Sequence, residues 1–409
     1  MMVKRDGRLL TLTGLRWAAA VAVFGQHILE QFFNQRLDAS KPIRSFIWAA
    51  LVNGGAVGVS FFFVLSGFVL TWSARPGDRA RTFWWRRFVK IYPATFVTTL
   101  AAIAVVGGVS TTQIVTHLTL SQSWTSRADI FAALNPVTWS LAVEVFFYLC
   151  FPLLLSLLRP VKPIVLWSMA VMMVEIVVAA AVILVHLDHT TAMWLAYIFP
   201  PVRLAEFILG IVVALLVRAD AWRGPGLRWA LPILGVATGA GLLVPFPVNQ
   251  HALTLIPVAM VVAAAARADL SGARTFWSRP GMLYLGNLSF AFYLVHLLVI
   301  IGADRLGLLP QHAPLPVALL VTSLLFAASF VAAMLVHHGV ELPAARLLRA
   351  DLRLRSDTRT PPARHRAARH RAVRGSRRPV SSRPVLQGQP VLSVPIQLSR
   401  TSRSPSAVR

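Results

Sequence analysis

The segment at residues 50–73, ALVNGGAVGVSFFFVLSGFVLTWS, decides the fold class, because none of its 24 residues is charged. A helix of about 20 such residues crosses about 30 Å of hydrocarbon. In the whole chain of 409 residues, 56% are hydrophobic and only 13% are charged, whereas about 25% of a soluble domain is charged. The composition therefore excludes a soluble globular enzyme, a disordered protein and a fibrous repeat, and it predicts an all-α polytopic membrane protein.

About ten segments are apolar and long enough to be transmembrane helices. They cover residues 9–31, 50–73, 91–109, 139–158, 163–186, 194–218, 228–247, 251–266, 282–302 and 317–338. Each is expected to be helical, because backbone groups in lipid have no water to bond. The amphipathic segment 113–136 is expected to be a surface or re-entrant piece.

Lysine and arginine are spread unevenly over the loops. Loops that follow the even-numbered predicted helices hold 14 of these residues, and the opposite loops hold five. Cytoplasmic loops are the richer ones in Lys and Arg. With an even number of helices, this bias predicts that both termini lie in the cytoplasm.

The last 64 residues differ from the rest of the chain. Residues 346–409 hold 16 of the 40 basic residues, two acidic residues and no aromatic side chain. Because such a segment buries too little apolar surface to fold, we predict a disordered Arg/Pro/Ser-rich cytoplasmic tail after a transmembrane domain at residues 1–345. Contact with anionic lipid headgroups is favoured over nucleic-acid binding, so no nucleic-acid partner is expected.

The first predicted helix carries Arg16 and His27. Eleven helical residues bring the two side chains to within about 20° of the same face, about 16 Å apart along the axis. Ionisable groups in hydrocarbon are costly and mark functional sites, so we expect both to face one cavity, with Arg16 near the cytoplasmic side. The alternative stays open, in which Arg16 extends to the headgroups and His27 is interfacial.

Further charged residues lie near helix ends. Arg86, Arg87 and Lys90 place three cations within one and a half turns before the third predicted helix. They can hold a polyphosphate by charge-assisted hydrogen bonds, although an ordinary basic cytoplasmic loop is the simpler explanation of this cluster alone. Glu144, early in the fourth helix, is expected on the side of His27.

Three other polar residues are expected to be structural. Arg203 and Glu206 are three residues apart in the sixth predicted helix, where they can form an ion pair. His296 in the ninth helix is expected to pack at a helix interface.

The chain has one cysteine, Cys150, and no metal-ligand spacing or Gly-rich phosphate loop, so neither a disulfide nor a metal site is predicted.

These motifs, taken in order, resemble those of the acyltransferase 3 family. The members of this family are bacterial integral membrane O-acyltransferases. The matching stretches are Leu12-Thr13-Gly14-Leu15 with Arg16-x10-His27, Phe61 to Phe68, Arg86-Arg87 to Pro93, Trp139-Ser140-Leu141 with Glu144, Arg203 to Gly210, Phe292 to His296, and Glu341-Leu342-Pro343. The resemblance covers about residues 9–345. It implies ten helices in the bacterial cell membrane and transfer of an acyl group, often acetyl, from a cytoplasmic acyl-CoA. The implied acceptor is a hydroxyl of an envelope glycan, a lipid or a secreted small molecule.

The resemblance also suggests roles for the charged residues. His27 would be the general base or an acyl carrier, and Glu144 would orient the base or the acceptor hydroxyl. Arg16 would hold the donor phosphates or polarise the thioester carbonyl. The cations at positions 86, 87 and 90 would bind the donor phosphates. The usual Arg-x-x-Arg pair of the family is Arg87-x-x-Lys90 here, and lysine keeps the charge but loses the bidentate fork.

Two other classes of function are compatible with many apolar helices. A multi-pass exporter of a modified glycan, lipid or acid predicts discontinuous midplane helices and pseudo-symmetric halves, and the sequence shows neither. A non-catalytic membrane scaffold would not need Arg16 and His27.

Overall fold

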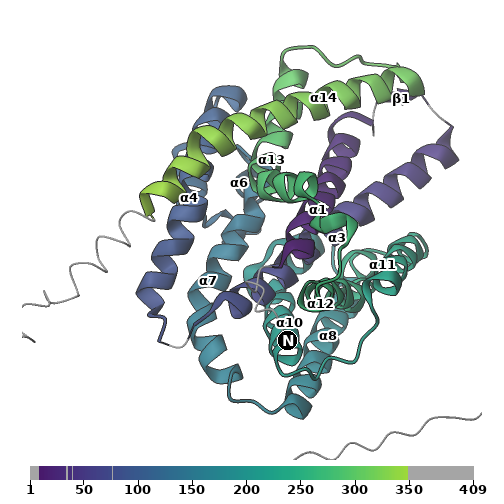
Figure 1. The fold of residues 1–409 in the computed structure, drawn as a ribbon. Coiled ribbons are helices and arrows are strands. Elements are labelled where there is room, and N and C mark those ends of the chain that lie inside the picture. Colours follow the sequence, from purple (N-terminus) through teal and green to yellow (C-terminus); the bar gives the residue numbers. More distant parts are fainter. Residues whose placement is uncertain (1–8, 34–35, 39, 76, 349–409) are drawn as a thin grey trace, which may run out of the picture. The chain divides into compact units, whose positions relative to one another are not determined.

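The computed structural model describes residues 9–33, 36–38, 40–75 and 77–348. The predicted tail at 346–409 therefore lies outside the described residues except for its first three positions. Eight helical stretches in the described part are long and apolar enough to cross a membrane, and α1 and the shorter α11 complete the ten predicted helices (Figure 1). The fold is thus an all-α polytopic membrane protein, as predicted. The orientation with both termini in the cytoplasm stays a prediction.

The ten main helices match the predicted segments in order. They are α1 (Leu10–Ile28), α3 (Lys41–Ser73), α4 (Ala80–Val106), α7 (Trp139–Leu158), α8 (Pro163–Leu184), α10 (Pro200–Arg218), α11 (Leu227–Ala240), α12 (Leu255–Leu270), α13 (Pro280–Arg305) and α14 (Leu315–Val336). The short helices are α5 (Thr111–Leu118), α6 (Ala128–Phe131), α9 (His189–Met193), η2 (Gln122–Trp124), η3 (Pro136–Thr138), η5 (Gly241–Leu243) and η7 (Phe276–Ser278). Four π-helical turns, η1 (Leu29–Phe33), η4 (Trp194–Ile198), η6 (Val248–Ala252) and η8 (His337–Glu341), extend or precede main helices.

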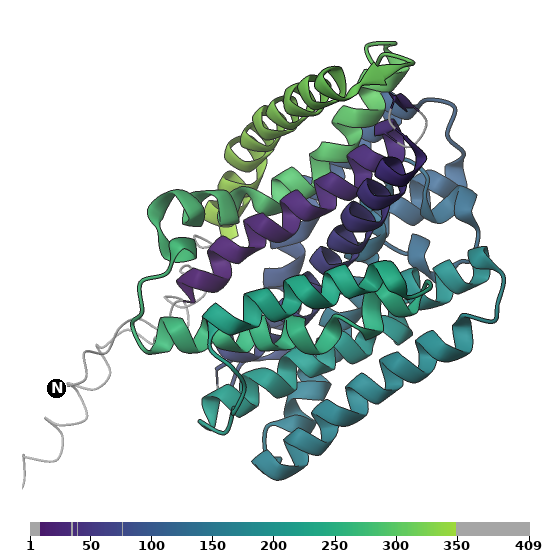
Figure 2. The ribbon, with the colours of Figure 1, turned by 90° about the vertical axis from the view of Figure 1, so that its right-hand side faces the viewer.

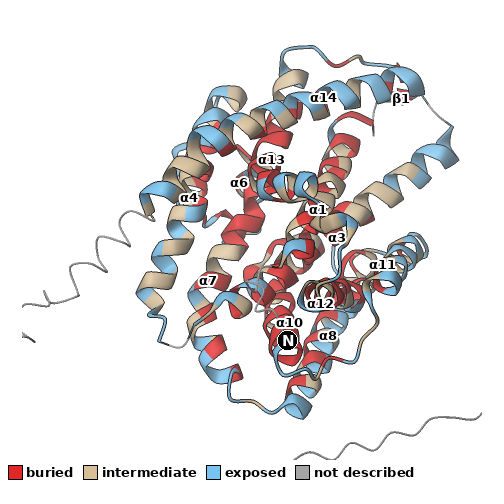
Figure 3. Cartoon of the chain, in the orientation of Figure 1, coloured by how far each residue is buried: buried red, intermediate tan, exposed pale blue. Residues whose placement is uncertain are grey.

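Burial separates an inner group of helices from an outer group. The middle parts of α3 and α13 and most of α10 and α12 are buried, whereas α4, α8 and α14 expose much of their surface (Figure 3). The exposed side chains on these outer helices are mostly apolar, such as Leu100, Ile183 and Leu324. An apolar outer surface of this extent is suited to contact with lipid rather than water.

The inner helices α3 and α10 pack backbone to backbone at two glycines. A Cβ atom added at Gly67 would overlap the carbonyl oxygen of Phe207, and one added at Gly210 would overlap that of Val64. Small residues allow this close approach, which drives helix association in lipid where the hydrophobic effect is absent.

Helix α1 lies alongside α3 and α13, as Figure 2 shows for the purple pair α1 and α3. At one end, β1 (Leu37–Asp38) pairs in parallel with β2 (Ala313–Pro314) and joins the loops before α3 and before α14. At the other end, the backbone N–H and hydroxyl of Thr11 donate to the Asp269 carboxylate at 2.6–3.0 Å. The strand pair thus joins two loops at one end of the helical domain, and the Thr11–Asp269 hydrogen bonds join α1 to α12 at the other.

The segment at 111–138 packs partly inside the protein. Gln122, Ser123 and Asn135 are buried, and the Asn135 side chain donates to the carbonyl of Leu294 in α13 at 2.8 Å. The predicted segment 113–136 therefore does not lie wholly on the surface. As a result, α7 begins within the helical domain and not at its edge.

The contact between α3 and α10 gives a stability prediction. We expect Gly210→Ala to lower the melting temperature of the detergent-solubilised protein by several degrees, because overpacking costs about 1–3 kcal/mol. Gly235→Ala in α11 is the control, since no atom lies within 4 Å of a Cβ added there. Equal melting temperatures for the two variants would contradict the close packing.

Candidate active site

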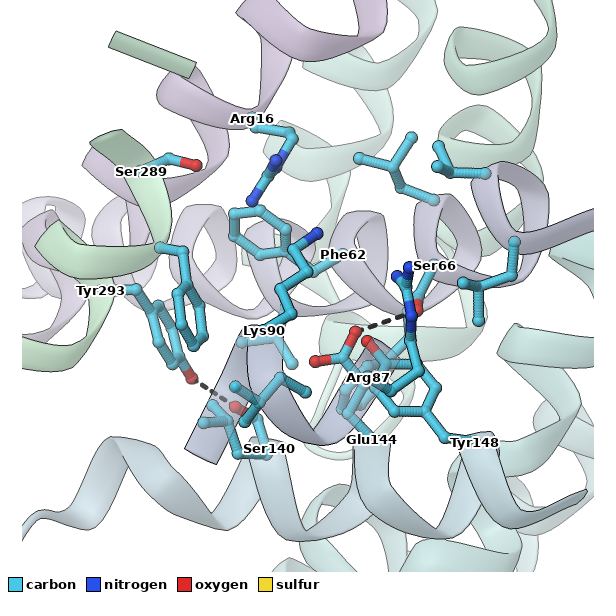
Figure 4. A pocket seen from close by; sticks show the side chains of 18 residues that line it. Arg16, Phe62, Ser66, Arg87, Lys90, Ser140, Glu144, Tyr148, Ser289 and Tyr293 are labelled. Carbon is cyan, nitrogen blue, oxygen red and sulfur yellow. Dashed lines mark hydrogen bonds between the residues drawn. The ribbon is translucent and has the colours of Figure 1, made fainter. Parts of the chain in front are cut away.

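A cavity of about 130 Å³ lies between α1, α3, α4, α7 and α13 (Figure 4). Its charged lining residues are Arg16, Arg87, Lys90 and Glu144. Its other polar lining residues are Ser66, Ser140, Tyr148, Ser289 and Tyr293. The remaining wall is apolar, so the cavity combines a small number of charged groups with apolar surroundings.

Each charged side chain comes from a different turn of a regular helix. Arg16 lies in the second turn of α1, and Arg87 and Lys90 lie one turn apart on α4, so that both point to the same side. Glu144 extends from α7 and accepts a hydrogen bond from the Ser66 hydroxyl of α3 at 2.9 Å. The rigid helices therefore fix where the charges lie in the cavity.

The cationic charges in this cavity are not neutralised by ion pairs. Among the described residues, none of Arg16, Arg87 and Lys90 has a carboxylate oxygen within 4.0 Å, and the Nε atom of Arg87 is buried with no hydrogen-bond partner. Arg16 and Arg87 are partly exposed and Lys90 is exposed, so a ligand in the cavity can reach these cations. The geometry is therefore suited to an anionic or strongly dipolar ligand.

A second carboxylate lies near these cations. Glu341 in η8 interacts electrostatically with Arg16 and Lys90, and its Oε2 atom is 2.7 Å from Nδ1 of His337. Its other oxygen is buried without a hydrogen-bond partner. The Glu341-Leu342-Pro343 motif carried no predicted role for Glu341, because only the folded chain brings this residue close to Arg16 and Lys90.

The structure brings together four of the six predicted site residues. Arg16, Arg87, Lys90 and Glu144 line the cavity. Arg86 does not line it and lies 3.9 Å from Asp78. Glu144 was expected near His27, but it lies with Arg16 instead, because α7 begins within the helical domain.

His27 is also not among the residues that line the cavity. Its Nδ1 atom is 2.9 Å from Nε2 of His296, and the ring of His296 lies 5.9 Å from the ring of Tyr293, which does line the cavity. The expected single cavity for Arg16 and His27 is therefore not observed. The histidine pair lies one aromatic ring beyond it.

The expected ion pair of Arg203 and Glu206 is confirmed, with an N–O distance of 2.9 Å and both side chains 1% exposed. The guanidinium also lies over the rings of Phe63 and Tyr197 at 5.0 and 5.5 Å. This paired cluster between α3 and α10 is structural, in contrast to the unpaired cations of the cavity.

Helices with lipid-compatible outer faces around a cationic cavity define a polytopic membrane protein with a candidate site within its helical domain. The comparison of sequences identifies the class more closely. Residues 9–337 match the family model of the acyltransferase domain, acyltransferase 3, and the chain belongs to this family. The protein is therefore an acyltransferase, which favours the enzyme over the exporter and the scaffold.

Several characterised relatives are similar to this chain. The acyltransferase MdmB of Streptomyces mycarofaciens is 39% identical over 375 residues, which are 85% of this chain and 94% of the relative. Nodulation protein 10 of Rhizobium leguminosarum bv. viciae is 30% identical over 282 residues, 62% of this chain and 74% of the relative. Peptidoglycan O-acetyltransferase OatA of Listeria monocytogenes is 29% identical over 174 residues, 37% of this chain and 25% of the relative. No solved structure matches the chain.

The buried ion pair of α10 gives a prediction on stability. Glu206→Gln keeps the size of the side chain but leaves the Arg203 guanidinium buried without its carboxylate, which is expected to cost about 3–5 kcal/mol. Thermal melting in detergent measures this loss. Asp220→Asn, at an exposed position just beyond the same helix, is the control, and an equally small effect of both substitutions would show that the pair is dispensable for folding.

Proposed function

We propose that the protein is an O-acyltransferase of the bacterial plasma membrane that uses acyl-CoA, first of all acetyl-CoA, as donor. The acceptor would be a hydroxyl group of an envelope glycan, a lipid or a secreted small molecule. The observation that carries the proposal is the set of three cations, Arg16, Arg87 and Lys90, in one cavity without ion-pair partners among the described residues. The family membership supplies the reaction class.

The cavity fits part of such a donor. Coenzyme A carries a polyphosphate, and guanidinium and ammonium groups bind phosphate through charge-assisted hydrogen bonds. Sites that enclose a drug-sized ligand have volumes of about 300–1,000 Å³, so a cavity of about 130 Å³ holds only part of the donor, its phosphates beside the cations. The adenosine would stay outside, towards the start of α4, where Arg86 remains a predicted donor contact.

The proposed reaction needs a base for the acceptor hydroxyl and a site that holds the donor. His27 takes the proton of the acceptor hydroxyl while the hydroxyl oxygen attacks the thioester carbonyl carbon. The carbon–sulfur bond then breaks, and the leaving thiolate recovers the proton from the His27 imidazolium. Arg16 lies in the cavity, about 16 Å from His27 along α1, so it binds the donor phosphates and not the carbonyl that reacts beside His27. Glu144, held by the Ser66 hydroxyl, orients the donor in the cavity.

The position of His27 sets a requirement on this reaction. Because the histidine pair lies beyond Tyr293, whose hydroxyl is 2.7 Å from the Ser140 hydroxyl, the acyl end of the donor must extend past this tyrosine to meet the base. The alternative role of His27 as acyl carrier has the same requirement. Both versions need an intact imidazole at position 27.

Transfer to a hydroxyl group is supported by a partial relative. The name of the Listeria relative specifies O-acetylation of peptidoglycan, but the matched region covers only 37% of this chain. The more fully matched Streptomyces relative is named only as an acyltransferase. We therefore propose the ester linkage and leave the acceptor at the level of a hydroxyl compound.

The proposed role of His27 predicts a loss of turnover. Membranes that contain the His27→Ala variant, supplied with radiolabelled acetyl-CoA, should form ester product at least about 100-fold more slowly than wild type, because general-base catalysis contributes that much or more. Immunoblotting confirms equal protein levels. Product formation at the wild-type rate would exclude His27 as base and as acyl carrier.

The proposed donor contact predicts an effect on the Michaelis constant. Arg87→Ala should raise the KM for acetyl-CoA by about 10-fold or more, because a hydrogen bond to a charged group contributes about 1.5–3 kcal/mol. Initial rates over a range of donor concentrations measure this change. Arg81→Ala, at an exposed position on the same helix, is the matched control, and an unchanged KM in the Arg87 variant would rule out the phosphate contact.

A further inference from the structure

We propose that His296 is a positioning residue that holds His27 in the one tautomer able to act as a base at Nε2. The proposal rests on the proposed role of His27 in acyl transfer. It assigns His296 a function beyond the helix packing that the sequence predicts for it.

The hydrogen bonds of His296 fix its own proton. Its Nδ1 atom is 3.0 Å from the carbonyl oxygen of Phe292, one turn earlier in α13. A carbonyl oxygen only accepts hydrogen bonds, so Nδ1 of His296 must carry the hydrogen. A neutral imidazole has a single N–H group, and Nε2 of His296 is therefore an acceptor.

The acceptor nitrogen of His296 in turn fixes the proton of His27. Nε2 of His296 is 2.9 Å from Nδ1 of His27, so Nδ1 of His27 must be the donor in this hydrogen bond. In neutral His27, the lone pair is then left on Nε2, where it can take a proton from a hydroxyl group. The opposite tautomer would place a hydrogen on Nε2 and leave no base.

The same hydrogen bond is suited to both states of the base. When His27 gains a proton at Nε2, Nδ1 still carries its hydrogen and still donates to His296. The proton transfer therefore needs no rearrangement of the pair. Two imidazolium rings at this distance would repel each other and would lack an acceptor, so His296 acts as the neutral partner.

Packing holds the ring of His296 in this orientation. His296 is fully buried, and its ring is stacked on that of Phe292 with an angle of 12° between the planes. The rings of Phe24 and Tyr293 lie 6.1 and 5.9 Å away. In this histidine pair, the backbone carbonyl of Phe292 orients His296, and His296 orients the base His27. In many catalytic triads, a carboxylate orients the base in the same way.

Two amide substitutions separate positioning from packing. The amide of glutamine extends to the place of Nε2 in histidine and keeps an acceptor for His27. The shorter amide of asparagine reaches only the place of Nδ1 and keeps the bond to Phe292 alone. We expect His296→Asn and His296→Ala to lower kcat by about 100-fold, comparable to losing the base, with the KM for acetyl-CoA within about 2-fold, and His296→Gln to recover most of kcat.

The measurements are initial rates with purified full-length protein in lipid nanodiscs, after thermal melting has shown that each variant is folded. His117→Asn is the matched control, because His117 is buried and its Nδ1 atom also lies 3.0 Å from a carbonyl one turn earlier, that of Gln113. We expect it to retain wild-type kcat. If His117→Asn loses as much activity as His296→Asn, general packing explains the loss and the positioning role is overturned.

The outcomes distinguish the two proposals. If His27→Ala is active, the proposed function of His27 fails, whatever the His296 variants show. If His27→Ala is inactive but His296→Asn retains wild-type kcat, only the positioning role is overturned. A glutamine variant as slow as the asparagine variant, at equal thermal stability, would also overturn it, since the acceptor would then have no effect.

Discussion

Lipid gives a buried charge no water, so each charge inside this helical domain depends on what the neighbouring helices provide. Arg203 has a carboxylate at 2.9 Å and two aromatic rings, so its charge is paired within the protein. Arg16 and Lys90 have no such ion pair among the described residues. The same physical constraint therefore distinguishes a structural charge from charges that are suited to a ligand.

Helix α1 connects the two parts of the proposed reaction. It carries Arg16 at the cavity and His27 at the histidine pair, about 16 Å apart along a rigid axis, and it packs between α3 and α13. Its contact with α13 is close, because a Cβ atom at Gly286 would overlap the carbonyl oxygen of Thr13. This packing sets the register that brings His296 to His27.

The sequence predicts the helices well and the histidine pair poorly, for different physical reasons. Apolar length is a local property, so all ten segments were recognisable. The resemblance assigned Arg16, Arg87 and Lys90 to the same donor, but the depth of Glu144 depends on the buried segment at 111–138. The pairing of His27 with His296 depends on the register of α1 against α13, which no local pattern specifies.

The separation of the base from the cationic cavity has a chemical advantage in the proposed reaction. A thioester next to an exposed base and water would be hydrolysed, and exclusion of water from a reacting centre prevents such side reactions. Tyr293, fixed by its hydrogen bond with Ser140, stands beside both the cavity and His296. A donor bound at the cations thus meets the base only when its acyl end passes this ring. The acceptor hydroxyl, and not water, can then be the group that occupies the position next to His27.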